Sequence, residues 1–167
     1  LQSQSNLVCR LLLEKKEASY AGIPLTHRDY AQSLAFVTGH LKENTFNMNW
    51  EGIARKDQTI VIYMGLKGLP LLCEALIKHG LTADTPAAII QHGTLPTQRV
   101  ITGDLTTLPK LAEQAGLKAP TLIIVGNVVK LREKLGWYQP ELHSEQAHLT
   151  PLEAVDFFFK QKTAYEI

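Results

Sequence analysis

Residues 59–90, TIVIYMGLKGLPLLCEALIKHGLTADTPAAII, decide the fold class of this chain. The stretch opens with the strand-forming run Thr59–Tyr63 and closes with a second apolar run, Ala87–Ile90. Between these runs, apolar residues recur at helical spacing as far as Gly80, at positions Leu69, Leu72, Leu76 and Ile77. This spacing predicts an amphipathic helix that ends at a glycine C-cap. A strand, a helix and another strand in succession predict a sheet layered with helices.

The same alternation of strand and helix patterns continues on both sides of this stretch. Leu34–Thr38 and Leu122–Val125 are further apolar runs, and Arg99–Gly103 is a weaker candidate. These runs are continuous rather than alternating, which is typical of strands buried on both faces. Further helical patterns run from Leu108 to Ala115, before Gly116, and from Val128 to Leu135, before Gly136. The chain is therefore predicted to be α/β, with about five strands layered with helices.

Composition excludes several classes of function. The 167 residues are 45% hydrophobic and carry 17 Lys+Arg against 16 Asp+Glu, a net charge of +1. We therefore expect no nucleic-acid partner and no binding to an anionic membrane. No apolar run approaches the ~20 residues of a membrane span. Leu11–Leu13 is followed at once by charged residues and by no cleavage site, so the expected location is cytoplasmic.

The cysteines and histidines indicate neither a disulfide framework nor a metal site. Cys9 and Cys73 lie far apart without a CxxC motif, which favours free thiols in a reducing compartment. None of the six histidines falls into HxxxH or HExxH spacing. We therefore expect no bound metal.

Glycine follows nearly every predicted strand. The strand ends are Val37-Thr38-Gly39-His40, Tyr63-Met64-Gly65-Leu66, Ile90-Gln91-His92-Gly93-Thr94 and Val125-Gly126-Asn127. Ligands of layered α/β sheets bind beyond the carboxyl ends of strands, and glycine lets a ligand approach the backbone closely. Ordinary turn chemistry explains each single glycine equally well. We expect the strand ends from Gly39 to Gly126 to form one side of a ligand niche.

Common cofactor and catalytic motifs are absent from the sequence. No GxGxxG motif opens a helix after a strand, Gly65-Leu66-Lys67-Gly68 lacks P-loop spacing, and no GxSxG motif occurs. A dinucleotide enzyme and a hydrolase are therefore disfavoured. The polar cluster Thr26-His27-Arg28-Asp29-Tyr30 follows Pro24 and should lie on a connection. It is either a surface loop or an edge that binds carboxylates through the fixed fork of Arg28.

Several motifs, in order and at consistent spacing, resemble a known family. They are Tyr20–Ser33 (YAGIPLTHRDYAQS), the strand ends at Val37–His40 and Tyr63–Leu66, Gly93-Thr94 with Gln98-Arg99-Val100, and Pro120–Gly126. Over about residues 18 to 138 they resemble the C-terminal half of the uroporphyrinogen-III C-methyltransferases. This branch of the tetrapyrrole methylase family includes the methylase module of sirohaem synthase.

The resemblance implies a tetrapyrrole methylase (class III methyltransferase) fold of two α/β domains, usually a homodimer. S-adenosyl-L-methionine would lie in the cleft between the domains and leave as S-adenosyl-L-homocysteine. Such enzymes methylate uroporphyrinogen III twice to give precorrin-2, which feeds sirohaem and cobalamin synthesis. Two alternatives remain: a methylase of a later cobalamin precursor, and a non-catalytic half-domain that binds nucleotide or dimerises.

Site residues are carried over from the family by position. Met64 and Gly93 match cofactor contacts, and the backbone at Gly65, Ala88 and Thr94 would frame the adenosine. Core filling is the alternative role for Met64, because methionine packs irregular gaps well. The substrate's carboxylates need cations, for which Arg28 and His27 are the candidates, with Lys67 third.

The resemblance also divides the chain. Residues 1–17 are a remnant of the N-terminal domain or a misread frame, 18–33 an interdomain connection, 34–138 the C-terminal cofactor-binding domain, and 139–156 an extension. Residues 157–167 are expected to derive from a sequencing adapter, because Lys160–Ile167 can be read from AAG CAG AAG ACG GCA TAC GAG AT. The family's Thr-Ala cofactor contact is replaced by Leu11–Glu17, and its Gly-Gly-Asp loop and acid/base candidates lie further upstream. Catalytic residues are therefore not assigned, and the chain is expected to be inactive alone.

Overall fold

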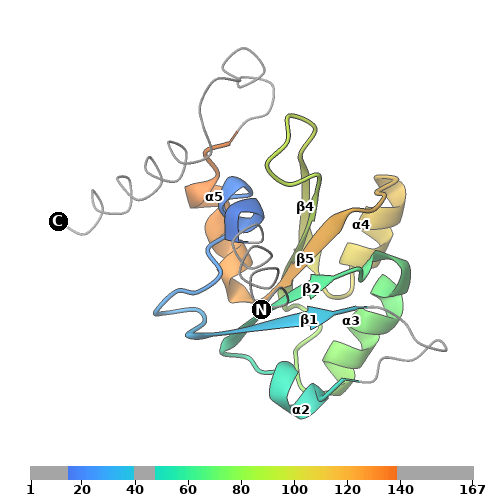
Figure 1. The fold of residues 1–167 in the computed structure, drawn as a ribbon. Helices are drawn as coiled ribbons and strands as arrows, with labels where there is room; N and C mark the ends of the chain where they lie inside the picture. Colours follow the sequence, from blue (N-terminus) through green and yellow to red (C-terminus); the bar gives the residue numbers. More distant parts are fainter. Residues whose placement is uncertain (1–14, 40–47, 139–167) are drawn as a thin grey trace, which may run out of the picture.

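A computed structural model describes residues 15–39 and 48–138 of the chain. Its centre is a sheet of five strands in the order β1-β2-β5-β3-β4 (Figure 1). The bounds are β1 Ser33–Thr38, β2 Gln58–Tyr63, β3 Pro86–Gln91, β4 Arg99–Asp104 and β5 Thr121–Val125. All five predicted strands are therefore confirmed, including the weaker candidate at Arg99–Gly103.

Strand direction divides the two edges of the sheet. β1 and β2 run parallel, β5 runs antiparallel to both β2 and β3, and β4 runs antiparallel to β3. Consequently β1, β2 and β3 end at one edge, where β5 begins. We call this end of the sheet, where Gly39, Met64 and Gly93 follow the three strands, the Met64 edge. β5 ends at the opposite edge, where β2 and β3 begin.

The helices follow the predicted periodicity closely. α3 spans Leu69–Lys78 and α4 spans Leu108–Gln114, which confirms both predicted helices. α2 is a single turn, Trp50–Ile53, and residues 15–20 are also helical. The helix predicted from Val128 to Leu135 is instead a 3₁₀ helix, η2 (Asn127–Leu131), followed by the short α5 (Arg132–Leu135). Both Val128 and Leu131 are buried, and a 3₁₀ helix places residues three apart on the same side.

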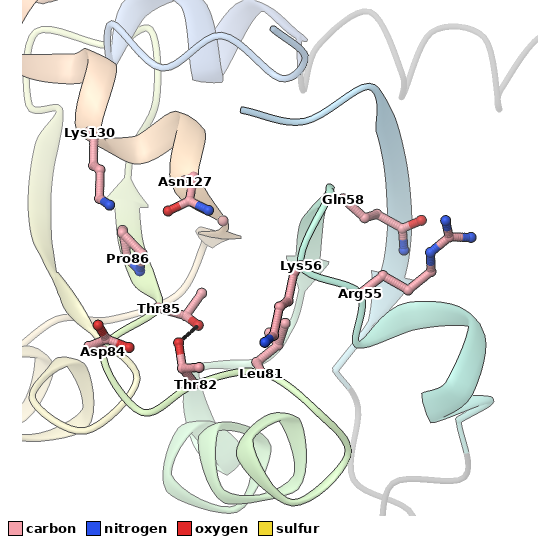
Figure 2. A pocket seen from close by; sticks show the side chains of 11 residues that line it. Arg55, Lys56, Gln58, Leu81, Thr82, Asp84, Thr85, Pro86, Asn127 and Lys130 are labelled. Atoms are coloured by element: carbon pink, nitrogen blue, oxygen red, sulfur yellow. Dashed lines mark hydrogen bonds between the residues drawn. The ribbon is translucent and has the colours of Figure 1, made fainter. Parts of the chain in front are cut away.

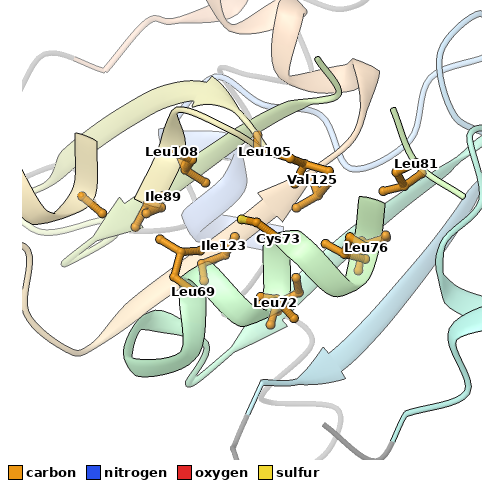
Figure 3. Packing of buried hydrophobic residues seen from close by; sticks show 14 of the residues in the cluster. Leu69, Leu72, Cys73, Leu76, Leu81, Ile89, Leu105, Leu108, Ile123 and Val125 are labelled. Carbon is orange, nitrogen blue, oxygen red and sulfur yellow. The ribbon is translucent and has the colours of Figure 1, made fainter. Parts of the chain in front are cut away.

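Two hydrophobic clusters lie on the two faces of the sheet. α3 and α4 cover one face, where Ile60, Ile62, Ile89 and Ile123 pack beneath them; Figure 3 shows α3 lying across β5 with Leu69, Leu72 and Leu76 turned to the sheet. Residues 15–23 and η2 cover the other face, with α5 beside them (Figure 1). Neighbouring strand residues point to opposite faces, so each continuous apolar run fills both clusters.

Residues 18–33, expected as an interdomain connection, contribute to the core of this unit. Ala18, Ala21, Ile23 and Ala31 are at most 2% exposed and pack on the second face. A Cβ on Gly22 would lie 2.6 Å from the Cα of Gly136, so this segment also packs tightly against the end of α5. The segment is therefore part of the layered domain that the structure describes.

Candidate functional site

Close backbone contacts bring the ends of β1 and β2 together at the Met64 edge. The N–H of Gly39 donates to the carbonyl oxygen of Tyr63 at 2.6 Å. A Cβ on Gly39 would lie 2.7 Å from the Cα of Gly65. The glycines that follow these two strands are therefore needed for the approach of one backbone to the other.

The Met64 edge also gathers unusual backbone conformations. Among the described residues other than glycine, positive φ occurs at Met64 (51°), His92 (51°) and Thr94 (70°). All three lie within three residues of the end of β2 or β3. Each such residue costs on the order of 1–3 kcal/mol, and such strain is concentrated at ligand sites. The clustering makes this edge the candidate site.

Met64 is exposed at this edge. Its exposed fraction is 56%, so the side chain does not fill the core, which was the alternative role for it. Leu95, in the turn that follows β3, is 51% exposed. β2 and β3 both neighbour β5, so their ends lie about 10 Å apart. Met64 and Gly93 therefore lie on one edge of the molecule, within the span of one nucleoside-sized ligand.

The space beside Gly93 is filled by Glu17. A Cβ on Gly93 would lie 2.6 Å from Cγ, 2.8 Å from Cβ and 3.0 Å from Cδ of Glu17. Burial raises the pKa of the Glu17 carboxyl above its usual range. Gly93 is therefore required by packing against residues 15–20, whatever else approaches it.

Gln98 holds the turn that contains Gly93 and Thr94. Its Oε1 accepts from the Thr94 N–H at 2.8 Å, and its Nε2 donates to the Tyr20 carbonyl oxygen at 3.2 Å. Only 9% of Gln98 is exposed. Sequence reasoning used Gln98 only as part of a motif and missed this role. The sequence signal for this role was the position of Gln98 directly before a strand. An amide side chain that becomes buried at such a position must find hydrogen-bond partners.

Gly65 and Ala88 belong to the interior. A Cβ on Gly65 would lie 2.8 Å from Cδ1 of Ile123, beneath α3. Ala88 is fully buried in the middle of β3, between Ile124 of β5 and Thr102 of β4. The structure therefore does not bring the Ala88 side chain to the Met64 edge.

His27 and Arg28 lie at the other end of β1. His27 and Ala31 close a tight turn, with backbone hydrogen bonds of 2.8 and 2.9 Å in the two directions. The His27 Nδ1 accepts from the Asp29 N–H at 3.2 Å. This turn precedes β1, whose six residues span about 20 Å. The two residues are therefore separated from Met64 and Gly93, whereas Lys67, exposed in the 3₁₀ helix η1 (Leu66–Gly68), lies close to Met64 in the chain.

A separate cavity lies at the opposite edge of the sheet (Figure 2). It has a volume of about 130 Å³, and its lining includes Lys56, Lys130, Asn127 and the hydrogen-bonded pair Thr82 and Thr85. Gly126 lines this cavity and donates its N–H to the Pro86 carbonyl oxygen at 2.8 Å. The expectation that Gly126 shares a niche with Gly39 is therefore wrong, because β5 runs antiparallel and ends at the other edge.

Two kinds of feature are not found among the described residues. Residues 15–39 and 48–138 contain no group of three His, Cys, Asp or Glu side chains that could hold a metal ion. Within the same ranges, no helix is long and apolar enough to cross a bilayer.

Comparisons with known proteins agree with this fold. The profile of the family described as Tetrapyrrole (Corrin/Porphyrin) Methylases matches residues 16–109. The chain is 86% identical over 139 residues to the siroheme synthase of Thiobacillus denitrificans, a match that covers 83% of this chain and 29% of that protein. It is 66% identical over 121 residues to the siroheme synthase of Nitrosomonas europaea, covering 72% and 26%. The chain thus spans less than a third of the length of these relatives.

Solved structures show the same architecture. The chain superimposes on uroporphyrin-III-C-methyltransferase from Thermus thermophilus with a TM-score of 0.59 and 34% identity, over 71% of this chain and 49% of that one. A structure of the Thermus enzyme complexed with S-adenyl homocysteine superimposes with a TM-score of 0.58 and 25% identity, over 69% and 48%. A cobalt precorrin-4 methyltransferase, at 17% identity and a TM-score of 0.61, shares the fold.

Proposed function

This chain belongs to the tetrapyrrole methylase family, and on that premise we propose that it supplies the C-terminal, cofactor-binding part of an S-adenosylmethionine-dependent C-methyltransferase. The reaction is the double methylation of uroporphyrinogen III to precorrin-2, in sirohaem synthesis. Relatives named siroheme synthase support this assignment, as does a structural neighbour complexed with S-adenyl homocysteine.

The observation that carries the proposal is the Met64 edge. An exposed methionine side chain offers an apolar surface against which an adenine ring can pack. The residues of positive φ after β2 and β3 turn the backbone sharply at this edge, where its N–H and C=O groups can meet the polar edge of a nucleoside. The residues present therefore fit an adenosyl cofactor, with Met64 and the backbone of Gly93 and Thr94 as the contacts.

Methyl transfer from S-adenosylmethionine requires little covalent catalysis by the protein. S-adenosylmethionine, when bound, supplies an electrophilic methyl group on a sulfonium sulfur. Positioning is then the main contribution of this chain, because alignment of reacting atoms supplies much of the catalysis in such transfers. In our proposal the Met64 edge holds the nucleoside, and Lys67, close to Met64 in the chain, is a cation available to a substrate carboxylate. Arg28 and His27 remain predicted carboxylate contacts on a separate part of the surface.

The proposal also covers assembly and location. Residues 34–138 form the cofactor-binding domain, with residues 18–33 packed on it, and the complete protein is a cytoplasmic homodimer. Sirohaem synthesis is favoured over the cobalamin branch because the most similar relatives reported above are siroheme synthases.

A chimera tests the activity. Residues 18–138 replace the matching segment of the siroheme synthase of Thiobacillus denitrificans, which is 86% identical over 139 residues. We expect the chimera to add two methyl groups to uroporphyrinogen III, measured by product mass, and its Gly93→Val form to lose cofactor affinity through backbone crowding. A folded chimera that binds S-adenosylhomocysteine and leaves uroporphyrinogen III unmethylated would contradict the proposal that uroporphyrinogen III is the substrate. Methylation of a later cobalamin precursor instead would establish the alternative.

Titration of this chain itself tests cofactor binding. We expect the chain to bind S-adenosylhomocysteine in a calorimeter and Met64→Ala to bind it more weakly, with Leu71→Ala, exposed on α3, as the control. Equal binding by Met64→Ala would remove Met64 from the site. Association of the chain with itself and no binding by any variant would favour the non-catalytic half-domain.

A further inference from the structure

Glu17 occupies the side of Gly93 that has no Cβ. The three closest atoms to a Cβ placed on Gly93 all belong to Glu17, at 2.6, 2.8 and 3.0 Å. Gly93 is not among the residues of positive φ, so its backbone conformation would accept a side chain. Glu17 therefore excludes a side chain at position 93, because its two methylene groups and its carboxyl carbon occupy the space that a Cβ would need.

The backbone of Glu17 is held firmly in this place. Ala18, the next residue, is fully buried in the second hydrophobic cluster. The carbonyl of Ser19 accepts from Nε1 of Trp137 at 3.1 Å, and that of Tyr20 accepts from Gln98. Gln98 also binds the Thr94 N–H, so one amide side chain ties residues 15–20 to the turn after β3. The helical segment cannot move away from Gly93 without breaking these contacts.

The Glu17 side chain is held at Gly93 by packing. Within residues 15–39 and 48–138, its carboxylate makes no hydrogen bond or ion pair. A partly buried carboxylate without a partner is unfavourable, and burial accordingly raises its pKa. Among the described residues, packing on Gly93 is thus the contact that holds this side chain. A ligand can displace it by rotation about its side-chain bonds.

We propose that Glu17 covers Gly93 and thereby lowers the affinity of this chain for S-adenosyl cofactors, so that position 17 controls access to the nucleoside site. The inference rests on the proposed function, in which Gly93 contacts the cofactor. It adds a residue outside the motifs on which the family resemblance depends, and it acts by occupying space rather than by charge.

Calorimetric titration of the full chain with S-adenosylhomocysteine tests the proposal. Glu17→Ala removes the covering atoms Cγ and Cδ, and we expect its Kd to fall about three- to tenfold, the range for one long side chain that no longer has to be displaced. Glu17→Gln keeps the shape without the charge, and its Kd should stay within about twofold of the unmodified chain. Glu133→Ala, exposed on α5, is the control for loss of a carboxylate.

The outcomes separate the two proposals. Equal or weaker binding by Glu17→Ala overturns the covering role and leaves the proposed function intact. An equal increase in affinity in Glu17→Gln and Glu17→Ala also overturns the covering role. The charge of Glu17, and not the space that it occupies, would then be responsible. Absence of binding in every variant overturns the proposed cofactor contact of this chain, and the inference falls with it.

A second measurement needs no ligand. Gly93→Ala should lower the urea midpoint of the unmodified chain because the new Cβ meets Glu17. In a Glu17→Gly background the same substitution should lose most of that effect, and the cost of glycine in the helical segment cancels within the cycle. An effect of Gly93→Ala that is equal in both backgrounds would show that Glu17 does not fill this space, and would overturn the inference.

Discussion

Replacing Gln98 by alanine should loosen the Met64 edge more than any other single polar substitution there. The amide of Gln98 is 9% exposed and joins the Thr94 N–H, at 2.8 Å, to the Tyr20 carbonyl oxygen, at 3.2 Å. Gln98→Ala removes two hydrogen bonds worth about 1 kcal/mol each and leaves both backbone groups to find water. We expect a loss of about 2–4 kcal/mol in the free energy of unfolding.

The assay is urea denaturation followed by circular dichroism, with hydrogen exchange at the Thr94 amide as a local readout. Gln32→Ala is the matched control, because Gln32 is exposed and its amide makes one long bond, 3.4 Å, to the Arg28 carbonyl oxygen. That variant should stay within about 0.5 kcal/mol of the unmodified chain.

A consequence for binding follows from the backbone at Thr94. Its φ of 70° is held by the bond to Gln98, so the turn should relax in Gln98→Ala and the Kd for S-adenosylhomocysteine should rise. The reasoning is refuted if Gln98→Ala unfolds at the same urea concentration as Gln32→Ala with unchanged protection of the Thr94 amide.

Three further predictions concern the core and the surface charges. Leu72→Ala should cost about 2–5 kcal/mol of unfolding free energy, whereas its neighbour Leu71→Ala, 45% exposed, should cost little in the same urea titration. Burial, with the charges of nearby carboxylates, raises the pKa of the Cys73 thiol to about 12, so mass spectrometry should find it unalkylated at pH 8 until urea unfolds the chain. Hydrogen bonds, first that from the Thr106 hydroxyl, lower the Asp104 pKa from 3.8 to about 2. Its contribution to stability is therefore full above about pH 4 and is lost as pH falls toward 2, and an Asp104→Asn chain whose acid unfolding is unchanged would contradict this.

The local sequence pattern was sufficient to predict the strands and the longer helices of the fold. Each strand and the two longer helices were predictable because hydrophobic periodicity and glycine stops act within a few residues of one another. Thr59–Tyr63 reads as a buried strand whatever lies beside it, and Leu69–Lys78 reads as a helix that ends before Gly80. The positions of Met64 and Gly93 after β2 and β3 were also predictable, because each follows an apolar run; their contact with a cofactor stays a prediction.

The tertiary structure alone decided the direction of β5 and everything that depends on it. An apolar run such as Leu122–Val125 looks the same in a parallel and an antiparallel strand, because periodicity records burial and not the direction of the neighbours. For that reason the sequence could not separate Gly126 from Gly39. Nor could it show that Arg28 lies a strand's length from Met64, or that Glu17 and Tyr20, far away in the chain, contact Gly93 and Gln98 in the turn after β3. Such contacts arise only when the sheet and its two covering layers have assembled.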